Sequence, residues 1–269
     1  MLNKLFQIEY IKTSLFKPFR VIITLHFLLF IISLLFGSNI NISIPGFSFR
    51  ELYMFPDVWQ YFTWIASWFN ILLVIIIIIL IGNEYNYKTF KQQVINSFDS
   101  TEIITEKIIS IVFISIYAFL LVLSAILISG FIFTRDLTLS IIFQNSGIIL
   151  SYLVQTLAFM TIGMLIVFIL KNTALSIVIF ILYRLLIEPI IRSFFSKDLR
   201  IFFPSKLFSN LTPIPDAFRI NYENTNINII TTEEITTYSP EPWLHHFLVI
   251  VYLLTLIFIS SQIIKKQNL

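Results

Sequence analysis

Residues 71–81 read ILLVIIIIILI, and the stretch at residues 83–107 reads NEYNYKTFKQQVINSFDSTEIITEK. The first stretch carries no charge, whereas the second carries seven charged side chains before another long apolar run begins. A helix needs about 20 consecutive apolar residues to cross a hydrocarbon core of about 30 Å. The sequence therefore predicts two membrane-spanning helices that are joined by a polar loop at residues 83–107.

The same alternation continues along the 269 residues of the chain. Hydrophobic residues make up 57% of the sequence and charged residues only 12%, whereas soluble domains carry about 25% charged residues. Apolar runs of this length must satisfy their backbone hydrogen bonds internally, and the sequence lacks the short alternating strands of a membrane barrel. We therefore expect an all-α integral membrane protein. Its six predicted spans are residues 19–36, 59–81, 108–133, 139–170, 173–191 and 243–264.

The distribution of Lys and Arg predicts the orientation of these spans. With the N-terminus inside the cell, basic residues outnumber acidic ones in the cytoplasmic segments, and acidic residues outnumber basic ones in the remainder. The cytoplasmic basic residues are then Lys4, Lys12, Lys17, Arg20, Lys88, Lys91, Lys107, Lys171, Lys265 and Lys266. The positive-inside rule therefore predicts a multi-pass protein of the inner (plasma) membrane with both termini in the cytoplasm. The net charge of +3 requires no nucleic-acid partner, because anionic membrane lipids attract the basic surplus.

The N-terminal segment, residues 1–18, is predicted to be an interfacial elbow helix. Its apolar side chains recur at helical spacing and are interleaved with Lys, Gln and Glu. Such a segment lies in the membrane interface, and Pro18 should bend the chain upward into the first span.

The loop at residues 83–107 contains a second amphipathic segment. Phe90, Val94 and Phe98 fall on one face of a short helix, beside polar residues. This segment is either an ordinary interfacial helix in a solvated loop or a docking element for a cytosolic partner. Asp99 and Glu102 have capping-box spacing and should start the third span.

The sequence carries no signature of catalysis or metal binding. The motifs HExxH and GxSxG do not occur, Cys is absent, and none of the six Gly residues is followed by the Lys that a P-loop requires. His245 and His246 are adjacent, so on a helix they point about 100° apart and cannot chelate one metal ion from one face. We therefore expect no catalytic residue, metal site or cofactor on this chain.

Arg184 and Glu188 are ionisable residues inside the fifth predicted span. Charges at such a depth are costly unless they are paired or face water. Their spacing of four residues favours a mutually neutralised pair in a helix that ends near Pro189, and the alternative is a role in a substrate pathway. Asn70, Gln155 and Thr156 are candidates for interhelical hydrogen bonds or for the same pathway. His26 in the first span is expected to be a hydrogen-bonded packing residue, and the alternative for it is a proton relay.

The segment at residues 192–242 is the largest part outside the predicted spans. Its first half is rich in phenylalanine and includes FFPSKLFSNLTPIP at residues 202–215, which is too apolar for free solvent. We expect this half to fold against the spans as short or re-entrant helices. The polar stretch NYENTNINIITTEEITTYS at residues 221–239 is expected at the surface.

The interfacial helix, the six spans and the loop together resemble the permease subunits of type 2 ATP-binding-cassette (ABC) transporters, in particular the stand-alone permeases of Bacteroidota-type bacteria. In that family an acidic residue, a small residue followed by Thr, an amphipathic coupling helix and a Lys at the third span occur in this order. The matching positions are Glu84, Lys88 with Thr89, residues 90–98 and Lys107, with Lys88 in place of the family's glycine. The resemblance implies that the ATPase-coupling residues are Glu84, Lys88, Thr89, Phe90, Val94, Phe98 and Lys107.

The resemblance covers essentially the whole chain and implies its function. A separate ABC ATPase subunit, which would hold ATP and Mg²⁺, would drive this permease to export an amphiphile, lipid or peptide. The permease would pair with a second copy or a sister permease, and residues 192–242 would include the family's extracellular re-entrant region. The alternative is a nontransporting membrane scaffold or sensor that the same ATPase drives. An intramembrane enzyme is disfavoured because its motifs are missing.

Overall fold

The computed structural model of the chain describes residues 13, 16–39, 43–44, 47–87, 89–90, 92, 99–215, 218 and 242–266. These residues are almost entirely helical, and six of their helical segments are long and apolar enough to cross a membrane. The segments are Lys17–Ser38, Asp57–Asn86, Ser100–Phe133, Leu139–Leu170, Thr173–Ser193 and Trp243–Lys266. The prediction of an all-α fold with six helices able to span a membrane is confirmed.

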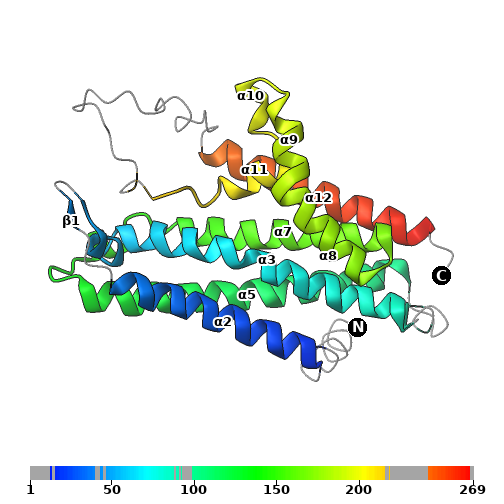
Figure 1. The fold of residues 1–269 in the computed structure, drawn as a ribbon, viewed down its shortest axis with the longest axis horizontal. Helices are drawn as coiled ribbons and strands as arrows, with labels where there is room; N and C mark the ends of the chain where they lie inside the picture. The colour runs from blue at the N-terminus through cyan, green and yellow to red at the C-terminus, as the bar shows by residue number, and fades with distance from the viewer. Residues whose placement is uncertain are drawn as a thin grey trace.

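The long helices form one elongated bundle (Figure 1). They are α2 (Lys17–Ser38), α3 (Asp57–Asn86), α5 (Ser100–Phe133), α7 (Ile148–Leu170), α8 (Thr173–Leu182) and α12 (Pro242–Lys266). The beginnings of α2, α5 and α8 and the last turns of α3, α7 and α12 lie at one end of the bundle, which we call the loop end (Figure 1).

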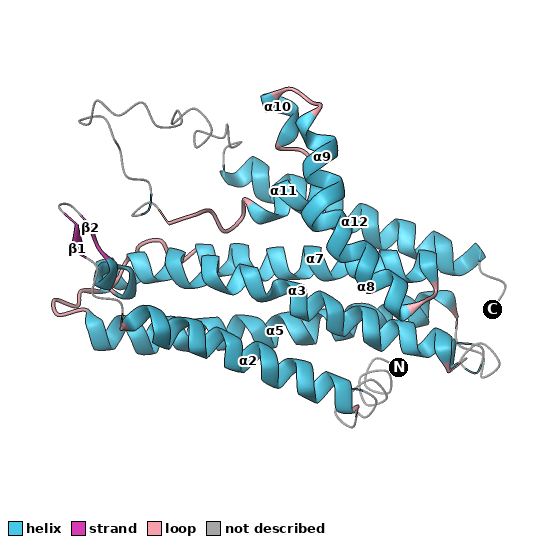
Figure 2. Cartoon of the chain, viewed as in Figure 1, coloured by secondary structure: helices cyan, strands magenta, loops and turns pink. Residues whose placement is uncertain are grey.

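The opposite end of the bundle carries one group of short elements, which includes the two strands (Figure 2). They are the antiparallel pair β1 (Ser43–Ile44) and β2 (Phe47–Ser48), the 3₁₀ helix η1 (Phe49–Tyr53) and α6 (Leu139–Phe143). A second group of short elements stands on one flank of the bundle (Figure 1). This group consists of the π-helical turn η2 (Tyr183–Ile187), α9 (Glu188–Ser193), α10 (Lys197–Arg200) and α11 (Pro204–Ser209).

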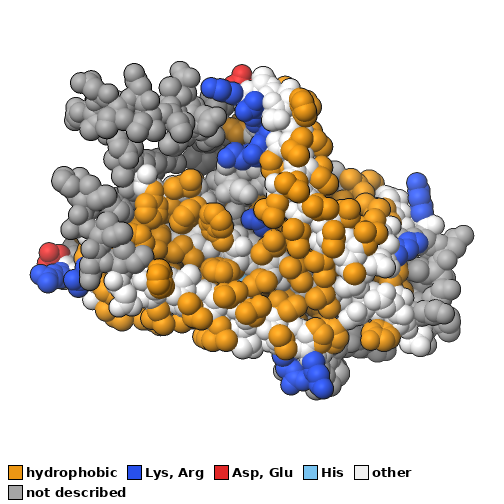
Figure 3. Space-filling model, in the orientation of Figure 1, with side chains coloured by type: hydrophobic (Ala, Val, Ile, Leu, Met, Phe, Trp, Pro, Cys, Tyr) orange, Lys and Arg blue, Asp and Glu red, His pale blue; other side chains and the backbone are white. Residues whose placement is uncertain are grey.

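The core of the bundle lies between α3 and α7, which make the most extensive helix–helix contact among the described elements. Gly163 on α7 lies so close to α3 that a β-carbon there would collide with Val74. Gly82 on α3 approaches Thr173 at the start of α8 equally closely. Small residues at such positions let helix backbones pack tightly in a membrane, where no hydrophobic effect drives helices together. Hydrophobic side chains cover most of the visible flank (Figure 3), as expected of a surface that faces lipid.

Two helices at the loop end are longer than the apolar runs predicted. Helix α3 continues to Asn86 and α5 begins at Ser100, so the connection between them is residues 87–99 rather than the predicted 83–107. The capping box predicted for Asp99 and Glu102 is present, and the Asp99 N–H donates to the Glu102 carboxylate at 3.0 Å. Both helices therefore carry charged residues in their terminal turns.

Two other spans differ from the prediction. The fourth has the predicted bounds, Leu139–Leu170, but it is broken into α6 and α7 at residues 144–147, where Asn145 has a φ of 64°, a left-handed conformation that Asn tolerates better than most residues. The fifth helix does not end near Pro189, because α9 continues to Ser193. The wider π-helical turn that precedes Pro189 accommodates the lost hydrogen bond and the proline ring.

The predicted elbow helix at residues 1–18 falls almost entirely outside the described residues. Pro18 itself lies in the first turn of α2. Proline is well tolerated there because its missing N–H would have no partner within the helix.

Candidate functional site

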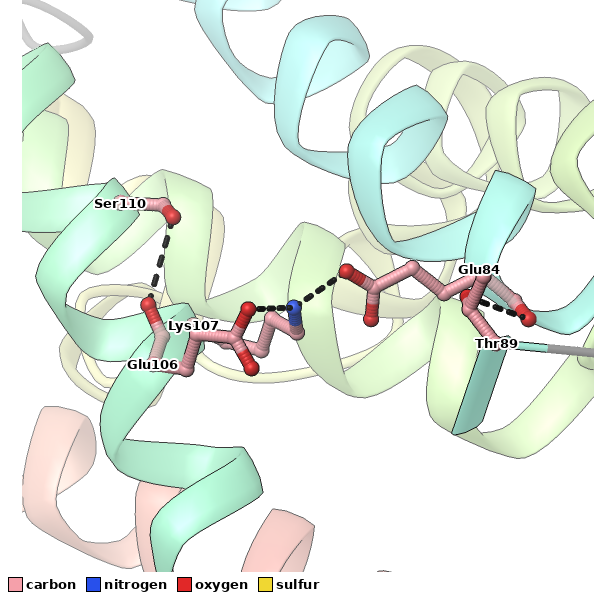
Figure 4. A network of polar contacts seen from close by, with 5 residues as sticks. All are labelled: Glu84, Thr89, Glu106, Lys107 and Ser110. Atoms are coloured by element: carbon pink, nitrogen blue, oxygen red, sulfur yellow. Dashed lines mark hydrogen bonds and ion pairs between the residues drawn. The ribbon is translucent and has the colours of Figure 1, made fainter. Parts of the chain in front are cut away.

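A network of buried charged side chains connects α3 to α5 at the loop end (Figure 4). The Lys107 Nζ atom lies 2.6 Å from Glu84 Oε1 and 3.5 Å from Glu106 Oε1. Lys107 is 1% exposed, Glu106 is 0% exposed and Glu84 is 8% exposed. Buried ions of this kind persist only when they are paired, because removing a charge from water costs several kcal/mol.

The ends of two helices bring these charges together. Glu84 lies in the last turn of α3, and Lys107 lies two turns into α5, after the capping box fixes where that helix begins. Lys107 and Glu84 are 23 residues apart in sequence. Their ion pair therefore joins the two helices that enter and leave the loop.

Thr89 and Phe90 fold back onto the same network. The Thr89 hydroxyl donates to the Glu84 backbone carbonyl at 3.1 Å, which satisfies one of the free carbonyls at the end of α3. The Phe90 ring is 1% exposed and packs against Tyr85, with 4.5 Å between ring centroids. The Lys107 ammonium lies 5.8 Å from the Phe90 ring centroid, within the range of a cation–π contact.

The structure places three of the predicted ATPase-coupling residues. Glu84, Phe90 and Lys107 are all buried inside this chain. They attach the first residues of the loop to α3 and α5, and their predicted part in coupling stays a prediction. Lys88, Val94 and Phe98 lie outside the described residues, so their predicted contact role stays a prediction.

Arg184 and Glu188 do not form the predicted ion pair among the residues that the structure describes. The Glu188 carboxylate, 2% exposed, accepts hydrogen bonds from the backbone N–H groups of Ser205 at 2.9 Å and Lys206 at 2.8 Å. The Arg184 guanidinium instead lies 4.3 Å from the centroid of the Phe159 ring. Residues four apart face each other in an α-helix, but η2 widens the turn between them, so the spacing rule fails here.

Three of the four polar residues predicted in the spans, Asn70, Gln155 and Thr156, meet in a single cluster. Gln155 donates to the Phe208 backbone carbonyl and to the Thr212 hydroxyl, both at 2.9 Å. Asn70 donates to the Gln155 side-chain oxygen at 3.3 Å, and Thr156 donates to the Asn70 oxygen at the same distance. All four side chains are buried. The sequence did not indicate the partners on α11 and its following turn, because only the fold brings them near α7.

The histidines bind separate partners. His245 lies 2.7 Å from the Leu207 carbonyl, and His246 lies 2.7 Å from the Ser151 hydroxyl. His26 is buried and packs against aromatic rings. Within the described part of the chain, no group of three or more His, Cys, Asp or Glu residues is placed to hold a metal ion.

The sequence matches none of the known protein-family models and none of the curated proteins with which it was compared. The loop-end network holds its charged groups in a salt bridge that joins α3 to α5.

Proposed function

We propose that this chain is the membrane permease subunit of an ABC transporter. A separate ATPase subunit would dock on the loop at residues 87–99 and hydrolyse ATP, and the permease would couple that hydrolysis to the export of an amphiphile, lipid or peptide. The loop end would face the cytoplasm, as the distribution of Lys and Arg predicts. The permease would act as a pair with a second copy or a sister permease, since six helices seldom enclose such a substrate alone.

The observation that carries this proposal is the buried link between Glu84 and Lys107. An external force on a loop moves a membrane helix only if the loop is firmly attached to it. Thr89 and Phe90 attach the start of the loop to α3, and the ion pair attaches the end of α3 to α5. A displacement of the loop would therefore move two spans together.

The amphipathic pattern of the loop supplies the docking surface in this proposal. Phe90 is buried as an anchor, so Val94 and Phe98, which follow it at helical spacing, would carry the contact with the ATPase. Apolar side chains on one face of a short helix are a recurrent means of binding a groove on a partner.

The test is to isolate the tagged chain from membranes of its source organism in a mild detergent. We expect a P-loop protein to co-purify, identified by mass spectrometry, together with vanadate-sensitive ATP hydrolysis in the eluate. Phe98→Asp should abolish both, because a charge in an apolar contact costs several kcal/mol.

The matched control is Phe194→Asp. Phe194 is 82% exposed, just beyond α9 and far from the loop along the chain, so this change should leave the co-purification intact. If wild-type protein purifies as a folded chain without an ATPase, or if Phe98→Asp retains the same ATPase, the proposed coupling role is wrong.

A further inference from the structure

The Arg184 guanidinium does not have a hydrogen-bond acceptor for every one of its N–H groups. Its Nη1 atom is buried and has no hydrogen-bond partner, although five N–H donors are available on an arginine side chain. The Phe159 ring stabilises the positive charge, but an aromatic ring is no conventional hydrogen-bond acceptor. A buried donor of a charged group without an acceptor is costly, so the site favours any ligand that brings one.

Two further basic residues, Arg192 and Lys206, lie on the elements that adjoin η2. The Phe159 ring beneath the guanidinium also packs against Phe208 on α11, with 5.6 Å between centroids. Lys206 lies two residues before Phe208 on that helix, and its N–H binds Glu188. Burial lowers the pKa of Lys206, and the nearby positive charge of Arg192 lowers it further. The elements η2, α9 and α11 thus each carry one basic side chain, and those of Arg192 and Lys206 lie within electrostatic reach of each other.

Glu188 is the carboxylate that lies beside these basic residues. Glu188 attracts Arg184 at longer range, but its two oxygens already accept hydrogen bonds from the N–H groups of Ser205 and Lys206. Within the described residues no salt bridge joins Glu188 to any of the three bases. The cluster therefore has more positive charge than its own acidic side chain neutralises.

The surface beside this cluster is apolar. Leu185 and Leu186 of η2 and Ile190 of α9 are exposed. Figure 3 shows Lys and Arg side chains gathered over the α9–α11 region, directly above the hydrophobic flank of the bundle. A molecule with a negative head and apolar tails would meet complementary surfaces at both ends.

We propose that Arg184, Arg192 and Lys206 form a binding site for the phosphate headgroup of an anionic membrane amphiphile, whose acyl chains lie along the exposed side chains of η2 and α9. A phosphate oxygen supplies the acceptor that Arg184 lacks, and planar guanidinium groups bind phosphate oxygens in paired hydrogen bonds. The binding itself does not depend on transport. Only the naming of this amphiphile as the exported substrate rests on the function proposed above.

The experiment measures the thermal unfolding of the purified chain in neutral detergent micelles, without ATPase or ATP. Micelles are supplemented with phosphatidylglycerol, with zwitterionic phosphatidylethanolamine, or with inorganic phosphate alone. We expect phosphatidylglycerol, at ten times its dissociation constant, to raise the melting temperature by about 4 °C over phosphatidylethanolamine. Arg184→Gln should weaken phosphatidylglycerol binding about tenfold or more and remove most of this rise.

Lys206→Gln is the second variant, because the half-buried Lys206 side chain can change with less risk to folding. It should also reduce the rise, whereas the control Arg50→Gln should preserve it, since Arg50 belongs to η1 and lies over the Phe133 ring of α5 rather than on η2, α9 or α11. An equal rise in wild type, Arg184→Gln and Lys206→Gln would overturn the site. An equal rise with phosphatidylethanolamine or with inorganic phosphate would show that an anionic amphiphile is not the ligand. The absence of ATPase makes each result independent of the coupling proposal.

Discussion

Replacing Lys107 with Met tests whether the loop end is held by its buried charges. Methionine has a similar length and good helix propensity, so the change removes the ammonium group with little change in volume. It leaves Glu84 and Glu106 without the cation that lies 2.6 Å and 3.5 Å from their nearest oxygens.

The size of the effect follows from these distances. With an effective dielectric constant of about 20, Coulomb's law gives about 6 kcal/mol of attraction at the shorter distance and about 5 kcal/mol at the longer one. Desolvation of the ions offsets most of this gain, but removal of one partner from a buried pair still costs about 3–5 kcal/mol. We therefore expect Lys107→Met to lower the free energy of unfolding by about 3–5 kcal/mol.

The order of the single variants is a sharper test than any one value. Glu84 makes the shorter contact, so Glu84→Gln should cost about 2–3 kcal/mol and Glu106→Gln less. The double variant Glu84→Gln/Lys107→Met should be more stable than the sum of the two single losses predicts, because both single changes break the same ion pair.

The assay is unfolding of the purified chain by sodium dodecyl sulfate in mixed micelles, followed by intrinsic tryptophan fluorescence. Lys265→Met is the matched control, because Lys265 is exposed in the last turn of α12 and such surface changes stay within about 0.5 kcal/mol. The reasoning is refuted if Lys107→Met costs no more than this control, or if the losses from Glu84→Gln and Lys107→Met simply add.

Two further predictions concern α11 and the topology. Glu188→Gln should lower the free energy of unfolding by about 2–3 kcal/mol, because it weakens two charge-assisted hydrogen bonds to the start of α11; an unchanged melting temperature would show that these bonds contribute nothing. Single cysteines at Lys91 and Asn226, in a chain that has none of its own, should react with a membrane-impermeant maleimide from opposite sides of the membrane, and labelling of both from outside would contradict the predicted orientation.

The sequence was sufficient to predict the spans because each is a long apolar run, and this requirement is local. It was not sufficient to predict how far α3 and α5 extend beyond their apolar runs. Glu84 and Lys107 look like loop charges when each is considered alone. They become compatible with buried helix ends only when they neutralise each other, and that relation joins residues 23 positions apart.

In the fifth span, a rule that holds for regular helices gave a wrong ion-pair prediction. Arg184 and Glu188 have the spacing of an ion pair on a regular helix. The π-helical turn between them and the free N–H groups at the start of α11 both change that outcome. A residue's best partner in a folded chain is often distant in sequence, and no helical spacing rule can identify such a partner.

Helix α3 connects the two polar regions of the bundle. Glu84 binds Lys107 at the loop end, and Asn70 on the same helix binds Gln155, which in turn binds the Phe208 carbonyl at the end of α11. Fourteen residues separate Glu84 from Asn70, which corresponds to about 21 Å along a helix. A displacement of α3 along its axis would strain the contacts at both positions, because a continuous helix transmits axial motion with little compression. The loop end and the α9–α11 region are thus attached to the same rigid element, which is the mechanical arrangement that a loop-driven membrane protein needs.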